Sequence, residues 1–255
     1  MPGTVNIRFY EELNDFLPPE QRKVAFQHCF KQPGSIKDMI EALGIPHTEI
    51  DLILVNGRSV DFNYIVQDGD RISVYPVFET LDISPINRLR PTPLRMTRFV
   101  LDTHLGRLAA YLRLFGFDTL YRNDYDDQTL ADISSRQHRI LLTRDIQLLM
   151  RKQITHGYFV RATQPRKQLE EVLARFDLYK TQRPFSRCLH CNGDIRPVTK
   201  EAIESHLLPD TSKRHQEFRQ CAHCHKIYWK GSHYEHLRRL VNAINEIAHS
   251  AKAEH

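Results

Sequence analysis

The chain has 255 residues, of which 41% are hydrophobic and 26% charged, and its formal net charge at pH 7 is +5. This length allows two or three small domains, and no apolar run approaches the roughly 18 residues that cross a bilayer, which excludes a helical membrane protein. The first residues lack the basic and apolar pattern of a secretory signal, so we expect a cytoplasmic protein that does not contact a membrane.

The charge is divided unevenly along the chain. Residues 1–80 carry 7 Lys and Arg against 12 Asp and Glu, whereas residues 97–255 carry 26 against 18. A basic C-terminal part favours a polyanionic partner such as nucleic acid, held by salt-dependent contacts. An ordinary solvated surface is the alternative.

Residues 1–80 form a compact α+β pattern. A capping serine, Ser35, precedes an amphipathic helix that stops at Gly44, and Asn56-Gly57 is typical of a hairpin turn. The predicted strands are residues 5–10, 24–30, 51–55 and 71–77. Cys29 falls in the second of these and is expected to be a buried strand residue.

The phrases Leu54-Val55-Asn56-Gly57 and Asp68-Gly69-Asp70-Arg71-Ile72 resemble the β-grasp domains of ubiquitin-like sulfur carriers. Those carriers end in an activated Gly-Gly, whereas here the chain continues from Pro76 to Thr80 and beyond. Sulfur transfer is therefore not expected. The region is interpreted as a module that packs against the chain or binds a protein partner, followed by a proline-containing linker over residues 81–96.

From residue 97 to 180 the pattern becomes strand, helix, strand, helix. The predicted strands are residues 98–102, 118–121, 139–143 and 157–161. Repeated βα units predict an α/β fold of three layers, with a parallel sheet between helices.

Aspartates follow the ends of these strands. Asp102 ends the first strand, Asp145 follows the third, and Asp124, Asp126 and Asp127 lie in the loop after the second. Ligands of such sheets bind beyond the carboxyl ends of the strands, and clustered carboxylates there favour Mg²⁺ or Mn²⁺. Metal-assisted phosphodiester hydrolysis is the chemistry that this pattern suits, although each of Asp102, Asp124, Asp127 and Asp145 has the alternative of capping a helix.

Two CxxC pairs occupy a predicted ribbon over residues 181–236, ahead of an amphipathic helix over 237–255. Cys188, Cys191, Cys221 and Cys224 supply the four thiolates of a closed, structural zinc site. The 29 residues between the pairs, 192–220, predict a hairpin with an irregular insertion.

Several motifs together resemble the mut-seven C-terminal RNase family, a branch of the PIN-like nucleases. They are Phe99-Val100-Leu101-Asp102, residues 105–109 and 112–118, residues 127–130 and 139–145, both cysteine pairs and residues 228–234. The resemblance covers roughly residues 97–237, and members with a ubiquitin-like N-terminal extension exist. It implies ribonuclease activity with acidic residues at Asp102, Asp127 and Asp145, and an appended zinc ribbon. For a fourth acidic residue, Asp124 ranks ahead of Asp126, Asp132 and Asp118.

Cationic and aromatic side chains supply candidates for RNA contact. Near the acidic residues these are Arg107, Arg113 and Arg144, of which the first two are six residues apart and cannot share one helical face. On the ribbon they are Trp229, Lys230 and His233, whose interleaved aromatic and cationic character suits base stacking. The alternative to a ribonuclease is a non-catalytic RNA-binding adaptor that retains the fold.

Overall fold

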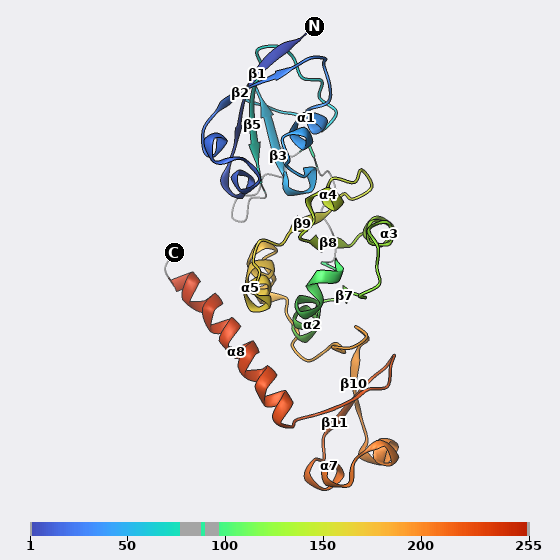
Figure 1. Cartoon of the computed structure of the whole chain (residues 1–255). Helices are drawn as coiled ribbons and strands as arrows, with labels where there is room; N and C mark the ends of the chain where they lie inside the picture. The colour runs from blue at the N-terminus through green and yellow to red at the C-terminus, as the bar shows by residue number, and fades with distance from the viewer. Residues whose placement is uncertain (1, 77–87, 90–96, 254–255) are drawn as a thin grey trace. The chain divides into compact units, whose positions relative to one another are not determined.

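A computed structural model describes residues 2–76, 88–89 and 97–253 (Figure 1), so most of the predicted linker over 81–96 lies outside the described residues. The described residues form two compact units. One contains those within 1–96 together with 125–159, and the other those within 97–124 and 160–255. Within the described part of the chain, no helix has both the length and the apolar character of a membrane span.

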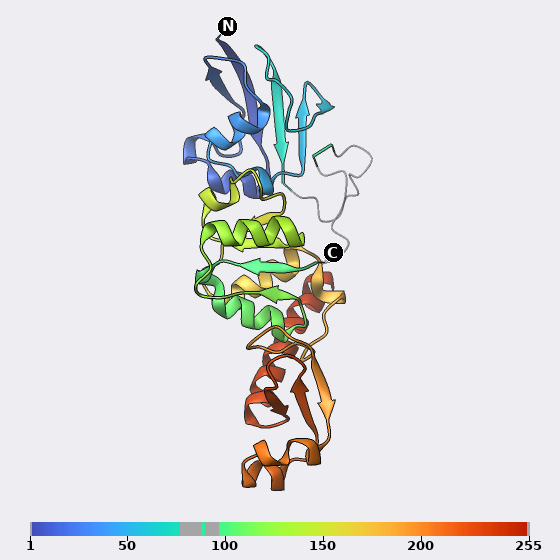
Figure 2. The ribbon, with the colours of Figure 1, turned by 90° about the vertical axis from the view of Figure 1, so that its right-hand side faces the viewer.

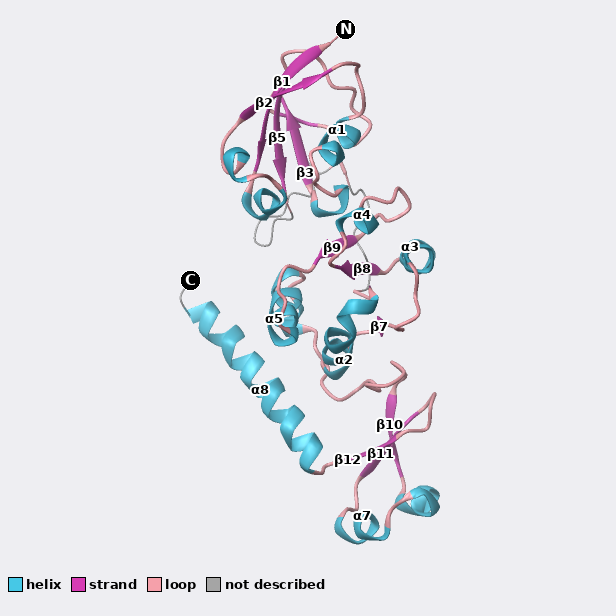
Figure 3. Cartoon of the chain, in the orientation of Figure 1, coloured by secondary structure: helices cyan, strands magenta, loops and turns pink. Residues whose placement is uncertain are grey.

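The N-terminal region is a five-stranded sheet of order β2-β1-β5-β3-β4 with one α-helix on it (Figure 3), which confirms the β-grasp prediction. Its strands are β1 (Gly3–Phe9), β2 (Phe26–Phe30), β3 (Leu52–Val55), β4 (Arg58–Ser59) and β5 (Arg71–Tyr75). Its helices are α1 (Ile36–Ala42) and the 3-10 turns η1 (Glu11–Phe16), η2 (Pro19–Gln21) and η3 (His47–Glu49). The Ser35 side chain caps α1 by accepting from the Asp38 amide at 3.1 Å.

The two phrases that suggested the β-grasp fold meet around one buried carboxylate. Asp70 is 4% exposed and accepts from Asn56 Nδ2 at 2.9 Å, the Tyr64 hydroxyl at 3.0 Å and the Gln67 amide at 2.9 Å. Asn56 in turn accepts from the Arg71 amide. These bonds fix the β3–β4 turn to the start of β5.

The prediction that Cys29 is buried is wrong. It lies on β2 as expected, but it is exposed, and its Sγ lies 3.6 Å from Thr4 Oγ1. Side chains alternate between the two faces of a strand, and the partly buried Phe26 and Phe30 lie on the face of β2 that packs on the core. Cys29 therefore lies on the opposite face.

The first unit also contains a βα segment from the middle of the chain. Its elements are α3 (Asp127–Gln137), β8 (Ile140–Thr143), α4 (Ile146–Leu149) and β9 (Gly157–Phe159). The fully buried Glu49 accepts from the Phe159 amide at 2.6 Å, and His47 Nε2 lies 2.8 Å from the Ile154 carbonyl. The turn η3 therefore satisfies backbone groups of β9 and of the loop before it.

The second unit begins with β6 (Phe99–Leu101), which pairs in parallel with β7 (Thr119–Leu120), just as β8 pairs in parallel with β9 in the first unit. Parallel strands separated by helices confirm the predicted α/β fold (Figure 2). Between β6 and β7 lie η4 (Thr103–Leu105) and α2 (Gly106–Leu114). After β9 the chain continues with α5 (Pro165–Arg175) and η5 (Leu178–Lys180). Phe99 of β6 packs edge-on against Phe117 and Phe176.

The ribbon is a three-stranded antiparallel sheet of order β10-β11-β12. It comprises β10 (Ile195–Val198), β11 (Phe218–Cys221) and β12 (Ile227–Trp229). The insertion between β10 and β11 is helical, with α6 (Lys200–Ile203), η6 (Glu204–His206) and α7 (Pro209–Arg214). The last helix, α8 (Ser232–Ala253), begins before the predicted 237 and buries Val241 and Ile244, as its amphipathic pattern predicted.

Candidate functional site

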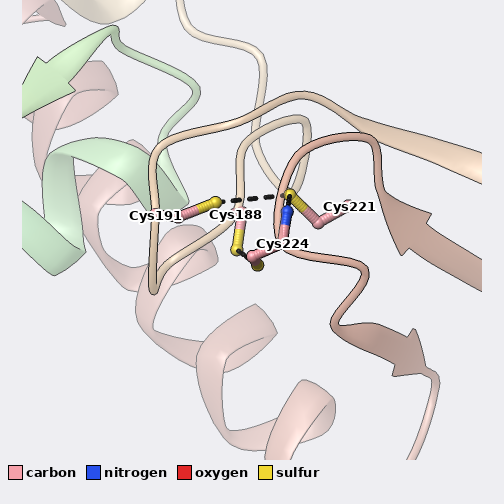
Figure 4. A group of neighbouring side chains, drawn as sticks. All are labelled: Cys188, Cys191, Cys221 and Cys224. Carbon is pink, nitrogen blue, oxygen red and sulfur yellow. Dashed lines mark hydrogen bonds between the residues drawn. The ribbon is translucent and has the colours of Figure 1, made fainter.

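The four cysteines of the ribbon meet in one cluster (Figure 4). Their Sγ atoms all lie within 4.8 Å of one another, with Cys188 3.6 Å from Cys224 and Cys191 3.4 Å from Cys221. A tetrahedral zinc ion with Zn–S bonds of about 2.3 Å needs sulfurs roughly 3.8 Å apart. The donor set and its spacing therefore fit a structural metal such as zinc.

Each cysteine pair lies in the same type of backbone turn. In the first, the Cys188 amide donates to Gly193 O and the Asn192 amide donates to Cys188 O. In the second, the Cys221 amide donates to the Lys226 carbonyl and the amide after Cys224 donates to Cys221 O. Both turns place the residue after the second cysteine at positive φ, 70° in one and 58° in the other. This repeated geometry aims both pairs of sulfurs at one point.

Hydrogen bonds to Cys188 Sγ favour the thiolate form of this residue. Burial raises the pKa of the Cys188 thiol, but the Tyr228 hydroxyl, 3.0 Å from its Sγ, and nearby backbone amides hold that pKa at about 7. Burial and the same contact raise the pKa of Tyr228, so its hydroxyl stays protonated and donates. Burial raises the pKa of Cys191 to about 12. Metal binding requires both thiols to lose their protons.

The backbone of Gly193 passes close to two of the sulfurs. A Cβ at this position would lie 2.9 Å from Cys221 Sγ and 3.4 Å from Cys191 Sγ. Only a residue without a side chain leaves both sulfurs where they are.

A buried arginine ties the first cysteine turn to α2. Arg113 is 5% exposed, and its guanidinium donates to the carbonyls of Thr119 at 2.9 Å and of Leu189 and His190 at 3.0 Å. The side chain of Asn192 adds bonds to the amide of Thr119 and to Asp118. A contact of Arg113 with RNA would require its bonds to be broken, so the geometry assigns it a structural role.

Asp102, Asp127 and Asp145 lie at the beginnings of helices, whereas Asp124 lies in the turn before α3. Asp102 is 8% exposed and follows β6, where its Oδ1 accepts from the amide and hydroxyl of Thr103. Asp145 follows β8 and caps α4, with Oδ1 accepting from two amides of the first turn at 2.8 and 3.3 Å. The capping alternative is therefore confirmed for both residues.

The loop after β7 contains the remaining acidic candidates. Asp127 is the first residue of α3, its side chain is 53% exposed, and it lies 3.3 Å from Arg151. The N-cap of α3 is Asp126, not Asp124 or Asp127. Asp124 is exposed and pairs with Arg122 at 2.7 Å, and the hydrogen bond from that arginine lowers the pKa of Asp124.

The other cationic and aromatic candidates lie at the surface. Arg107 is exposed on α2, and the exposed Arg144 lies over the Phe159 ring, with its guanidinium carbon 6.0 Å from the ring centroid. On the ribbon, Trp229, Lys230 and His233 line one pocket of about 460 Å³. Sequence reasoning grouped these three residues by composition and did not predict the pocket.

Two family models match the chain. One, described as the Mut7-C RNAse domain, matches residues 97–241, and the other, described as Mut7-C ubiquitin, matches residues 3–82. No curated protein and no solved structure matches the chain.

Proposed function

The chain belongs to the Mut7-C RNAse domain family, with the ubiquitin-like domain of that family at its N-terminus, and from this membership we propose that it is a metal-dependent ribonuclease. In this proposal Asp102, Asp127 and Asp145 hold Mg²⁺ or Mn²⁺, with Asp124 as an accessory carboxylate. The family match over residues 97–241 is the observation that carries the proposal.

The chemistry of the aspartates supports this assignment. Each follows a strand of a parallel pair, where α/β folds bind their ligands, and carboxylate oxygens are the ligands that Mg²⁺ and Mn²⁺ prefer. Within the described residues, Asp145 uses only Oδ1 in its cap and Asp127 only Oδ2 in its ion pair. Each therefore keeps one oxygen that can bind a cation.

A bound divalent cation would supply Lewis-acid activation of water and stabilisation of the leaving oxygen. The residues of the chain position the reactants. The Thr103 amide and hydroxyl orient the Asp102 carboxylate, and the first-turn amides of α4 orient that of Asp145. Arg107 and Arg144 are proposed to contact RNA phosphates, because guanidinium groups bind phosphate oxygens in pairs.

The ribbon is proposed to assist RNA binding, with zinc as its structural ion and with Trp229, Lys230 and His233 as contacts. We also propose the domain boundaries predicted from the sequence, 1–80, 97–180 and 181–236, with a linker over 81–96. The C-terminal helix predicted over 237–255 starts earlier, at Ser232. We propose a cytoplasmic location, because paired CxxC cysteines suit a reducing compartment. We also propose that the β-grasp domain binds a protein partner.

Cleavage of a mixed RNA substrate tests the activity. The full chain, loaded with zinc, is incubated with RNA and Mn²⁺ or Mg²⁺. Asp102→Asn and Asp145→Asn are compared with the control Asp177→Asn, which changes an exposed carboxylate after α5. We expect cleavage by the unaltered chain and by the control, and a loss of at least 100-fold in both test variants. RNA binding without cleavage by the unaltered chain would refute the proposal and favour the adaptor.

A further inference from the structure

A pocket of about 460 Å³ is lined by residues of the ribbon, of the end of α2 and of the first turns of α8. Its volume is within the roughly 300–1,000 Å³ range of small-molecule sites. The walls are mainly apolar and aromatic, and include Leu114, Phe185, Ile195, Tyr228, Trp229 and Tyr234. The pocket is therefore large enough for one planar ring system and apolar enough to desolvate it.

Trp229 offers an aromatic surface to this pocket. The residue is 40% exposed, and a Cβ at Gly231 would lie 2.9 Å from its Nε1, so the indole lies against the turn that leads into α8. Tyr228, also in the wall, is held in place by its hydroxyl contact with Cys188. An aromatic wall fixed by a turn and by the metal centre is suited to stacking.

The charge around the pocket is predominantly positive. Four cationic side chains and one carboxylate line it. Lys230 pairs with the carboxylate of Glu217 at 2.6 Å, which offsets that negative charge. Within the described part of the chain, the side chains of Arg219 and Lys226 form no hydrogen bond or ion pair. Two exposed cations beside an apolar pocket complement a ligand that combines a flat ring with phosphate groups.

We propose that this pocket binds one unstacked base of single-stranded RNA, with the base against Trp229 and the flanking phosphates on Arg219 and Lys226. The inference rests on the proposed function and deepens it, because it specifies that the RNA bound by the ribbon is single-stranded. Duplex RNA keeps its bases stacked and paired, so it cannot fill such a pocket without unpairing.

The composition of the chain provides a direct readout, because Trp229 is its only tryptophan. The zinc-loaded full chain is titrated with an eight-nucleotide oligouridine without added Mg²⁺ or Mn²⁺, and its tryptophan fluorescence is recorded. The matched ligand is an oligomer of the same length and charge whose central four sugars carry no base. We expect quenching by oligouridine, and binding at least 5-fold weaker with less quenching for the abasic oligomer.

Labelled-RNA anisotropy compares variants in the same buffer. Trp229→Ala is expected to weaken oligouridine binding about 5- to 150-fold, the range for loss of one stacked base, while Trp229→Phe restores most of the affinity. Neither variant should change binding of the abasic oligomer. Lys226→Gln is expected to weaken both ligands alike and to reduce the salt dependence of binding.

Equal affinity for the abasic oligomer and oligouridine would overturn the pocket assignment. So would an RNA duplex that quenches the tryptophan fluorescence as strongly as oligouridine does. Cleavage by the unaltered chain in the presence of Mn²⁺ would then still support the proposed function. Loss of RNA binding in Trp229→Ala, with no cleavage by the unaltered chain at any metal concentration, would support the pocket and refute the ribonuclease.

Discussion

The buried guanidinium of Arg113 gives the sharpest test of how the ribbon is attached to α2. Arg113→Gln removes the fork that reaches the carbonyls of Thr119, Leu189 and His190. Hydrogen bonds from a charged donor contribute about 1.5–3 kcal/mol each, and the buried Thr119 carbonyl cannot regain a water partner. The carbonyl of His190, an exposed residue, can bind water instead. We therefore expect the free energy of unfolding to fall by about 2–4 kcal/mol rather than by the sum of three bonds.

The assay is thermal unfolding of the zinc-loaded chain, followed by chelator competition. A loss of about 2–4 kcal/mol lowers Tm by roughly 5–15 °C at this chain length. Because the first cysteine turn loses its support, we also expect zinc affinity to fall by about 10-fold or more. Arg107→Gln, an exposed change on the same helix, is the matched control and should alter Tm by less than about 2 °C. Equal Tm values and equal zinc retention for the two variants would refute the reasoning.

Three further changes test the metal centre and the β-grasp domain. Tyr228→Phe removes the hydrogen-bond donor that lowers the pKa of Cys188 to about 7, so this pKa should rise and protons should compete better with the metal. In a chelator titration, the pH at which half of the zinc is lost should therefore move upward. Gly193→Ala should lower zinc affinity about 10-fold by crowding the sulfurs, as the same titration would show, and unchanged affinity would contradict the close approach. Asp70→Ala leaves buried donors without an acceptor and should reduce the free energy of unfolding by about 2–4 kcal/mol in urea, whereas Asp61→Ala, at an exposed turn, should cost less than about 1 kcal/mol.

Much of the fold follows from local patterns in the sequence. The β-grasp strands, the parallel βα units and the cysteine cluster were predicted because each depends on short-range periodicity or on fixed spacing. The two motifs that suggested the β-grasp fold also have a physical role. The side chain of Asn56 donates a hydrogen bond to Asp70, which connects the end of β3 to the start of β5.

Features that depend on tertiary contacts could not be predicted in this way. Arg113 was predicted as a candidate for RNA contact and not as a structural residue, because two of the carbonyls that accept from it belong to residues 76 and 77 positions away in the sequence. The exposure of Cys29 depends on which face of β2 packs on the core. At α3, several adjacent aspartates compete for the cap, and backbone geometry selects Asp126. The ribbon pocket needs residues from β12, α8 and the end of α2 together.

The bond between Glu49 and the Phe159 amide has a consequence for how the chain can be shortened. β9 is the last strand of its sheet, and unpaired strand edges recruit other strands. A fragment that begins at residue 97 loses Glu49 and His47 together, and with them the acceptor that covers this edge. We expect such a fragment to self-associate in solution, because the edge of β9 can then pair with strands of other molecules. On this reasoning the N-terminal domain protects the chain from aggregation.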